Sequence, residues 1–289
     1  MGNWDPQSAS GTSSDDMRAA VDTHLASHIG DHETAFCDEE GWAGHSREDG
    51  PPIDVLVVPP EGERLFAYVA TFGCAFRPLP SEAYHDEGVE RRVEFVLAAQ
   101  QVGKEDPDLH SLNLAANTVR QFAKLVHLNG VTVEPGETVA FSDDPKPVYD
   151  DADFCAFAFI PPRLPGPGFE WLMPSNTALG EPVRYIAPIP IHKAELEYGV
   201  ELGGEALVKL LMDAGATEMI DLKRPCAVSA RPDLQMALES KQAELAEKDK
   251  SGKPEAELEE FTAVGKAALV SGNEKRGLFS WILSLVGIR

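Results

Sequence analysis

The apolar stretch at residues 183–211 constrains the fold more than any other part of the chain. Apolar or aromatic residues occupy every second position from Val183 to Ile189, the period of two that is typical of a strand with one face against a core. Pro188 and Pro190 have no backbone N–H to donate to a sheet, so we expect them to mark the edge or end of that strand and to form a corner. The stretch therefore predicts a strand that turns into a helix.

The helix after this corner has its own periodicity. Leu207, Leu210, Leu211 and Ala214 lie at i, i+3, i+4 and i+7, which places them on one face of a helix. Gly215 suits the position just past the helix end, where a left-handed backbone conformation is common. We interpret the strand and the helix as structural elements, because they contain no recognised catalytic motif.

Other runs predict further elements. The run Phe154–Ile160 is apolar throughout, so we expect a central strand buried on both faces. The apolar spacing from Leu112 to Val126 predicts a long helix, with Asp106 as its N-cap, and a first helix is expected over 15–30. The remaining predicted strands are 53–58, 65–72, 92–98, 138–141 and 218–222.

Composition divides the chain into three predicted parts. We expect residues 1–14 to be disordered, residues 15–225 to form one α/β domain, and residues 226–289 to form a charged helical extension. At 43% apolar residues, the chain is able to bury a sizeable core.

The chain is strongly acidic, with a formal net charge of -23. Such a charge repels phosphate backbones and anionic membranes, so a nucleic-acid partner is not expected. The charge has two interpretations: solubility, or an acidic face that meets a basic protein. The same two interpretations apply to a loop whose carboxylates are Asp143, Asp144, Asp150, Asp151 and Asp153, which is either a solvated turn or a docking surface.

The cysteines indicate a reducing compartment. Cys37, Cys74, Cys155 and Cys226 lie far apart, without the close pairs of a zinc site or the density of a disulfide scaffold. The first ten residues lack the basic and apolar regions of a signal peptide, and no apolar run approaches the roughly 20 residues that span a bilayer. We therefore expect a cytoplasmic location.

One group of residues has the spacing of metal ligands. His24, His28 and His32 lie at i, i+4 and i+8, and imidazoles one helical turn apart are able to chelate zinc. The alternative, which we favour, is a polar helix face, because Gly30 is expected to end the helix before His32. The sequence contains no P-loop, nucleophile elbow or dinucleotide fingerprint. We expect no catalytic set, no metal and no cofactor.

The apolar run 277–289, GLFSWILSLVGIR, predicts an amphipathic helix that is too short to cross a membrane. It has three predicted roles: lying on a membrane surface, packing on its own domain, or inserting into a partner. Because the acidic chain opposes anionic lipid, we favour docking over membrane contact, with Phe279 and Trp281 as candidate anchors.

An ordered series of short motifs resembles the suppressor-of-fused-like domain family over roughly residues 31–222. The series contains Ile53-Asp54-Val55 with Pro59-Pro60, Thr71 and Gly73, Arg92-Val93-Glu94-Phe95-Val96-Leu97, Phe159-Ile160-Pro161-Pro162, and the stretch from Pro188 to Leu211 with Pro190, Glu195, Leu196, Glu197 and Leu207.

The resemblance implies an α/β (α+β) domain, a mixed sheet flanked by helices, and protein binding in place of catalysis. Animal members sequester a transcription factor, and bacterial members often act as immunity proteins that neutralise a toxin. The leading hypothesis is therefore an immunity protein that occludes a basic toxin. Two alternatives are a scaffold or regulator that recruits a partner or membrane through residues 277–289, and a metal-dependent hydrolase that uses the three histidines.

Overall fold

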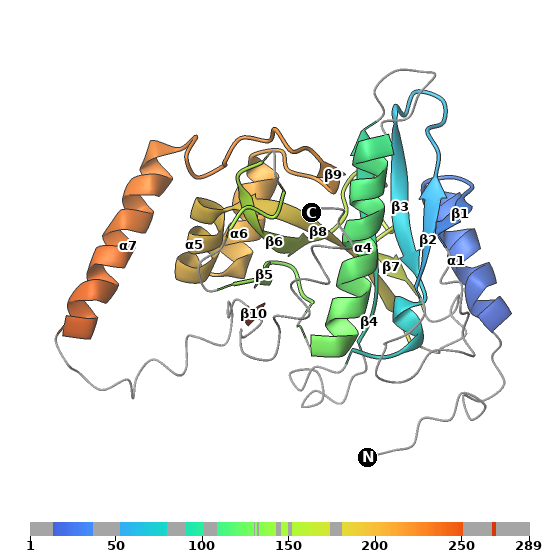
Figure 1. Ribbon diagram of the computed structural model, residues 1–289, viewed down its shortest axis with the longest axis horizontal. Helices are drawn as coiled ribbons and strands as arrows, with labels where there is room; N and C mark the ends of the chain where they lie inside the picture. Colours follow the sequence, from blue (N-terminus) through green and yellow to red (C-terminus); the bar gives the residue numbers. More distant parts are fainter. Residues whose placement is uncertain are drawn as a thin grey trace, which may run out of the picture. The chain divides into compact units, whose positions relative to one another are not determined.

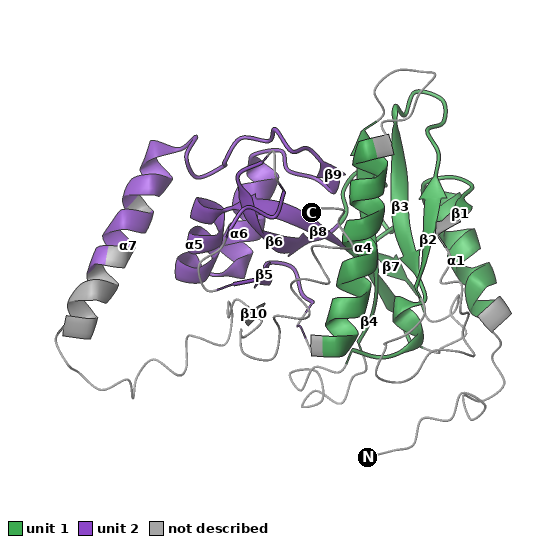
Figure 2. Ribbon diagram, in the orientation of Figure 1, with its two compact units in different colours: residues 1–130, 162–186 green, residues 131–161, 187–289 purple. Residues whose placement is uncertain are grey.

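The computed structural model describes residues 14–36, 53–79, 91–100, 109–129, 131, 133–142, 146–149, 152–173, 181–250 and 268–269. The chain divides into two compact units (Figures 1 and 2). Unit 1 contains residues 1–130 and 162–186, and unit 2 contains residues 131–161 and 187–289. Strand β8 (Val183–His192) begins in unit 1 and ends in unit 2.

The sheet of unit 1 is mixed. Strands β1 to β4 follow one another as antiparallel neighbours, and the first half of β8 then pairs with β4 in parallel. The short strand β7 (Trp171–Leu172) pairs with the same part of β8. The bounds are β1 Glu33–Phe36, β2 Asp54–Val58, β3 Phe66–Phe72 and β4 Arg92–Gln100.

Two helices cover opposite faces of this sheet. On one face, α4 (Leu109–Asn129) packs with Phe122 against Phe95 of β4, their ring centroids 6.1 Å apart. Tyr185 of β8 pairs with Glu94, the neighbour of Phe95, so its side chain points to the other face. There α1 (Ser14–His28) places the ring of His24 5.1 Å from that of Tyr185.

The sheet of unit 2 is built around β6 (Phe154–Ile160), which pairs with β5 (Thr138–Ala140) and with the second half of β8. Every residue of β6 is buried, as its apolar sequence predicts. A further strand, β10 (Ala268–Leu269), pairs with β5 in parallel, and β9 (Met219–Ile220) lies within the predicted strand 218–222. A mixed sheet flanked by helices is therefore confirmed.

Three helices form a second core in unit 2. They are α5 (Lys193–Leu202), α6 (Gly204–Asp213) and α7 (Pro232–Lys250). Tyr198, Leu210 and Leu238, one from each helix, share a buried cluster with Ala227 and Val228. The described part of the charged helical extension expected over 226–289 is therefore packed on its inner face, because Leu238 of α7 is buried in this cluster.

The end of α6 follows the predicted pattern. Gly215 has φ +80° and lies just after the capping residue Ala214. The N–H of Ala216 donates to Leu211 O, and that of Gly215 to Met212 O, which is the Schellman arrangement. The prediction of Gly215 as the residue past the helix end is confirmed.

The predicted corner at Pro188 and Pro190 is wrong, because both prolines lie inside β8, paired with Phe159 and Phe157. The backbone of Phe159 exchanges hydrogen bonds with Gly136 and Glu137, on the side away from β8. Pro188 therefore occupies a non-hydrogen-bonded pair, where the missing N–H faces away from β6. The side of β8 that lacks these two N–H groups is therefore the side that does not pair with β6. The prolines do not interrupt the strand, which continues to His192.

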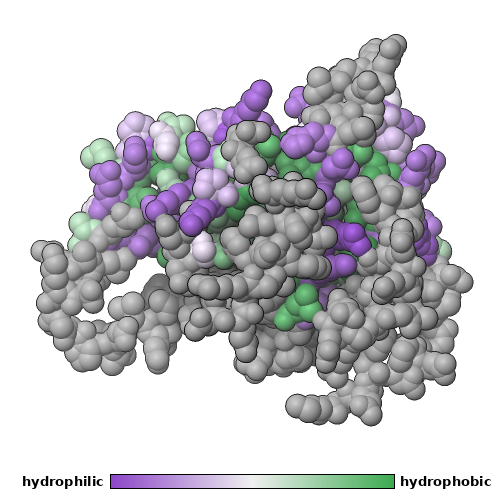
Figure 3. All heavy atoms as spheres, in the orientation of Figure 1, coloured by the Kyte–Doolittle hydropathy of each residue, from purple (hydrophilic) through white to green (hydrophobic). Residues whose placement is uncertain are grey.

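Several predictions fall outside the described residues. These are the disorder of residues 1–14, except for Ser14, which begins α1, together with the N-cap at Asp106 and the helix at 277–289. Among the helices that the structure describes, none is long and apolar enough to cross a membrane. On the face seen in Figure 3, hydrophilic and hydrophobic residues are intermingled over the described surface.

Candidate binding site

A buried carboxylate organises the polar centre of unit 2. Glu195, in the first turn of α5, is 0% exposed and accepts two hydrogen bonds from Arg224, at 2.6 and 2.7 Å. It also accepts the backbone N–H groups of His192 at 2.9 Å and Ala227 at 2.7 Å. Glu195 therefore caps the start of α5 and also forms a buried ion pair with Arg224.

Arg224 and His192 hold each other in place. The guanidinium of Arg224 donates to Pro190 O at 3.1 Å and lies over the Phe154 ring. His192 Nε2 lies 3.0 Å from Arg224 O, and its ring is 4.3 Å from that of Phe154. The loop at Arg224 is therefore attached to β8 from both its side chain and its backbone.

Electrostatics keep Glu195 ionised. Burial raises the pKa of its carboxyl, but the hydrogen bonds and charge of Arg224 and the amides of Ala227 and His192 outweigh that effect. The net pKa lies below the ordinary glutamate value. Since both charges are satisfied internally, this pair stabilises the loop and is not a free acid or base.

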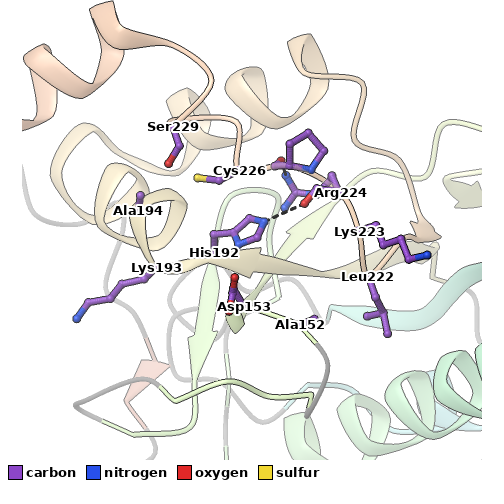
Figure 4. A pocket seen from close by; sticks show the side chains of 11 residues that line it. Ala152, Asp153, His192, Lys193, Ala194, Leu222, Lys223, Arg224, Cys226 and Ser229 are labelled. Atoms are coloured by element: carbon purple, nitrogen blue, oxygen red, sulfur yellow. Dashed lines mark hydrogen bonds between the residues drawn. The ribbon is translucent and has the colours of Figure 1, made fainter.

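An open depression of about 580 Å³ lies beside this pair (Figure 4). The end of β8, the start of α5 and the loop after β9 supply most of its wall. His192 and Arg224 lie at its centre, while Lys193, Lys223 and Asp153 extend around it (Figure 4). The other lining residues are Ala152, Ala194, Leu222, Pro225, Cys226 and Ser229.

Unit 1 has its own buried carboxylate, Glu94 of β4, which is 1% exposed. It accepts Thr71 Oγ1–H at 2.6 Å and the backbone N–H groups of Gly73 and Ala75, each at 3.0 Å. These bonds fix the loop after β3, where Gly73 has φ +118° and begins the short 3-10 helix η1 (Cys74–Phe76).

Burial dominates the titration of Glu94. It raises the pKa of the carboxyl to about 7, although the hydrogen bonds from Thr71, Ala75 and Gly73 act in the opposite direction. Its cross-strand neighbour Tyr185 is 0% exposed, with a phenol pKa raised well above the ordinary value, first by burial and then by the charge of Glu94.

Cys74 and His127 approach each other in unit 1, with Sγ 3.5 Å from Nε2. Burial raises the pKa of the Cys74 thiol well above its ordinary value. Burial also lowers the pKa of His127 to about 4, so its imidazole is a weak base. An activated nucleophile needs the reverse arrangement, a stabilised thiolate beside a competent base. The pair therefore lacks the electrostatics of a catalytic dyad.

The structure brings two of the three predicted histidines together. The rings of His24 and His28 are 4.8 Å apart on α1, which ends at His28. His24 Nε2 lies 2.8 Å from Phe169 O, and a carbonyl only accepts, so this nitrogen carries a proton. His32 lies beyond the helix, with Nε2 2.7 Å from Asp22 Oδ1. Within the described ranges, no group of three ligands is placed to hold a metal ion.

Only one of the predicted partner-binding residues is described. Asp153 is exposed and lines the depression, beside the start of β6. The other predicted positions, which are Asp143, Asp144, Asp150, Asp151, Phe279 and Trp281, lie outside the described residues.

Sequence reasoning missed the partner of Glu195. Arg224 is 29 positions away, in a loop between β9 and α7, and no periodic pattern connects the two. The sequence offered only a weak signal, a glutamate in a first helical turn directly after the apolar strand, and neighbouring charged residues such as Lys193 and Glu197 gave it no distinction.

Comparison with known proteins gives a consistent result. The family model described as suppressor of fused protein matches residues 49–225. Drosophila Suppressor of Fused is 13% identical, with a TM-score of 0.53 over 78% of this chain and 54% of that one, so this chain covers about half its length.

Two other solved structures are similar over nearly their whole chains. A chain of the Sufu–Fu complex is 12% identical, with a TM-score of 0.50 over 77% of this chain and 96% of that one. A putative suppressor of fused homologue from Neisseria gonorrhoeae is 18% identical, with a TM-score of 0.50 over 75% and 98%. No match is found among curated protein sequences. At these identities, the structural likeness shows the fold.

Proposed function

Since the chain belongs to the suppressor of fused family, we propose that it is a non-enzymatic protein-binding module of the cytoplasm, and more specifically an immunity protein that neutralises a toxin by occlusion. The family match over residues 49–225 is the observation that carries the protein-binding part of this proposal. A chain of similar fold comes from a structure described as the Sufu–Fu complex, which supports a protein partner.

The buried carboxylates of the two units are hydrogen-bonded to other groups of the protein, which supports a binding function over a catalytic one. The carboxylate of Glu195 accepts hydrogen bonds from Arg224, and that of Glu94 accepts them from a hydroxyl and from backbone amides. The Cys74–His127 pair lacks an activated nucleophile. Occlusion requires a preformed surface and no such nucleophile.

The net charge of -23 supports a basic partner. An acidic surface speeds association with a basic protein and orients it, as it would a cationic nuclease toxin. Asp153 is an exposed carboxylate of the described surface that would take part.

Co-expression tests the proposal. Cells that make the toxin encoded in the neighbouring gene should survive when this chain is made as well, and purified chain and toxin should form a stoichiometric complex that weakens with salt. A variant with Asp153→Lys should protect less than one with Asp213→Lys, an exposed aspartate on α6. Death of the co-expressing cells without complex formation would reject the immunity role.

A further inference from the structure

The depression in unit 2 is a candidate recognition site of opposite charge to the rest of the chain. Lys193 and Lys223 are exposed, and neither ammonium group has an ion-pair partner among the described residues. Figure 4 shows them on opposite sides of the His192–Arg224 centre. In a chain with 48 acidic and 25 basic residues, two lysines around one depression that lack an ion-pair partner in the described part of the chain form a local cationic surface.

The loop between the two lysines, which contains Arg224 and Ala227, is held in place by hydrogen bonds. Arg224 is held by Glu195 and Pro190, and the N–H of Ala227 donates to the same carboxylate. A ligand therefore would not have to order this loop, which removes one of the entropic costs of binding. Because Glu195 neutralises Arg224, the net positive charge of the site comes from Lys193 and Lys223.

We propose that this depression binds a short acidic peptide segment of a protein partner, with carboxylates that pair with Lys193 and Lys223. Apolar side chains of Ala194, Leu222 and Pro225 in the lining provide contact for an uncharged residue between the carboxylates. Asp153 is the exposed carboxylate of the lining and opposes such a ligand.

The net negative charge of the chain favours a short anionic ligand over a long one. A long polyanion such as nucleic acid would meet repulsion from the whole chain, at -23, along its length. A segment with two or three carboxylates meets less of this repulsion, and its attraction to two nearby ammonium groups is local. An acidic peptide is therefore the ligand class that the charges favour.

Cys226 provides a reporter inside the site. It is a partly exposed free thiol of the lining, whereas Cys74 is fully buried in unit 1. The rate at which iodoacetamide alkylates Cys226, followed by peptide mass spectrometry, should fall when a ligand covers the depression. Alkylation of Cys74 in the same sample reports unfolding.

The probes are end-blocked peptides in which two glutamates are separated by one to three alanine or leucine residues, compared with glutamine counterparts. Glutamate peptides should slow Cys226 alkylation in the full chain, and glutamine peptides should not. Lys193→Glu and Lys223→Glu should each raise the half-protecting concentration about threefold to tenfold, and Asp153→Asn should lower it.

Lys209→Glu is the matched control, because Lys209 is an exposed lysine of unit 2 that is paired with Asp213 outside the depression. Equal protection by glutamate and glutamine peptides, no protection by either, or the same loss in the Lys209 variant would overturn the proposal. The measurement uses the purified chain alone, so its outcome is independent of rescue from a toxin.

Discussion

Glu94 and Glu195 are both buried glutamates, but their hydrogen-bond donors differ in charge. Glu195 is bound by the guanidinium of Arg224, and its carboxyl pKa lies below the ordinary value. The donors to Glu94 are the hydroxyl of Thr71 and backbone amides, and burial holds its pKa at about 7. One residue type therefore serves as a permanent anion in unit 2 and as a group that titrates near neutral pH in unit 1.

Stability should depend on pH through Glu94. Its folded pKa of about 7 exceeds the unfolded value of about 4.3, so the folded state binds the proton more tightly. The stabilisation is complete below the unfolded pKa and is lost as pH rises through 7, a change on the order of 2–4 kcal/mol. We expect Glu94→Gln to remove this fall, as measured by urea unfolding at pH 4.5 to 8.

Glu195→Gln is the matched comparison for Glu94→Gln, because its pH dependence has the opposite sign. The depressed pKa of Glu195 contributes stability above the unfolded pKa, and that stability is lost as pH falls toward the folded pKa. The cost of Glu195→Gln should therefore be largest near neutral pH and shrink in acid. Parallel pH profiles for the two variants would contradict the assignment of the two carboxylates.

A close contact between Gly204 and Gly136 fixes the position of the start of α6. A Cβ atom on Gly204 would lie 2.8 Å from the carbonyl oxygen of Gly136, in the loop before β5. Such an approach to backbone cannot be relieved by rotating a side chain. The contact sets the separation between this loop and α6.

Gly204→Ala should therefore destabilise the protein by about 1–3 kcal/mol, measured by thermal or denaturant unfolding. Helix propensity alone predicts the reverse sign, a gain of about 0.5–1 kcal/mol for Gly to Ala within a helix. Glu205→Ala, at the next position of the same helix, should change stability little. A stabilising Gly204→Ala would mean that the loop moves without cost.

Local periodicity accounts for most of the predicted elements. The strands β2, β3, β4 and β6 and the end of α6 at Gly215 follow from apolar runs and turn residues. The corner at Pro188 was wrong because a missing N–H excludes only one side of a strand, and the unit 2 ladder uses the other. The pairing of Arg224 with Glu195 required the tertiary fold, because loop positions have no periodicity.

Two features of this protein appear only when the whole chain is considered, its division into two units and its distribution of charge. The chain has two compact units, and β8 belongs to both. The net charge of the chain is strongly negative, but Lys193 and Lys223 line the depression in unit 2 without an ion-pair partner among the residues that the structure describes. Two recognition chemistries are therefore proposed for one chain: an acidic surface for a basic toxin and a small cationic site for an acidic segment.

The apolar run 277–289 is a second predicted contact with a partner. Truncation after Gly272 should leave the unfolding transition unchanged and abolish protection from the toxin, if Phe279 and Trp281 insert into a partner. The full chain should not sediment with phosphatidylserine vesicles, because anionic lipid repels a chain of charge -23. Phe279→Ala with Trp281→Ala should reproduce the truncation, and Ser280→Ala should not. A truncated chain that still protects cells would remove the run from the binding surface.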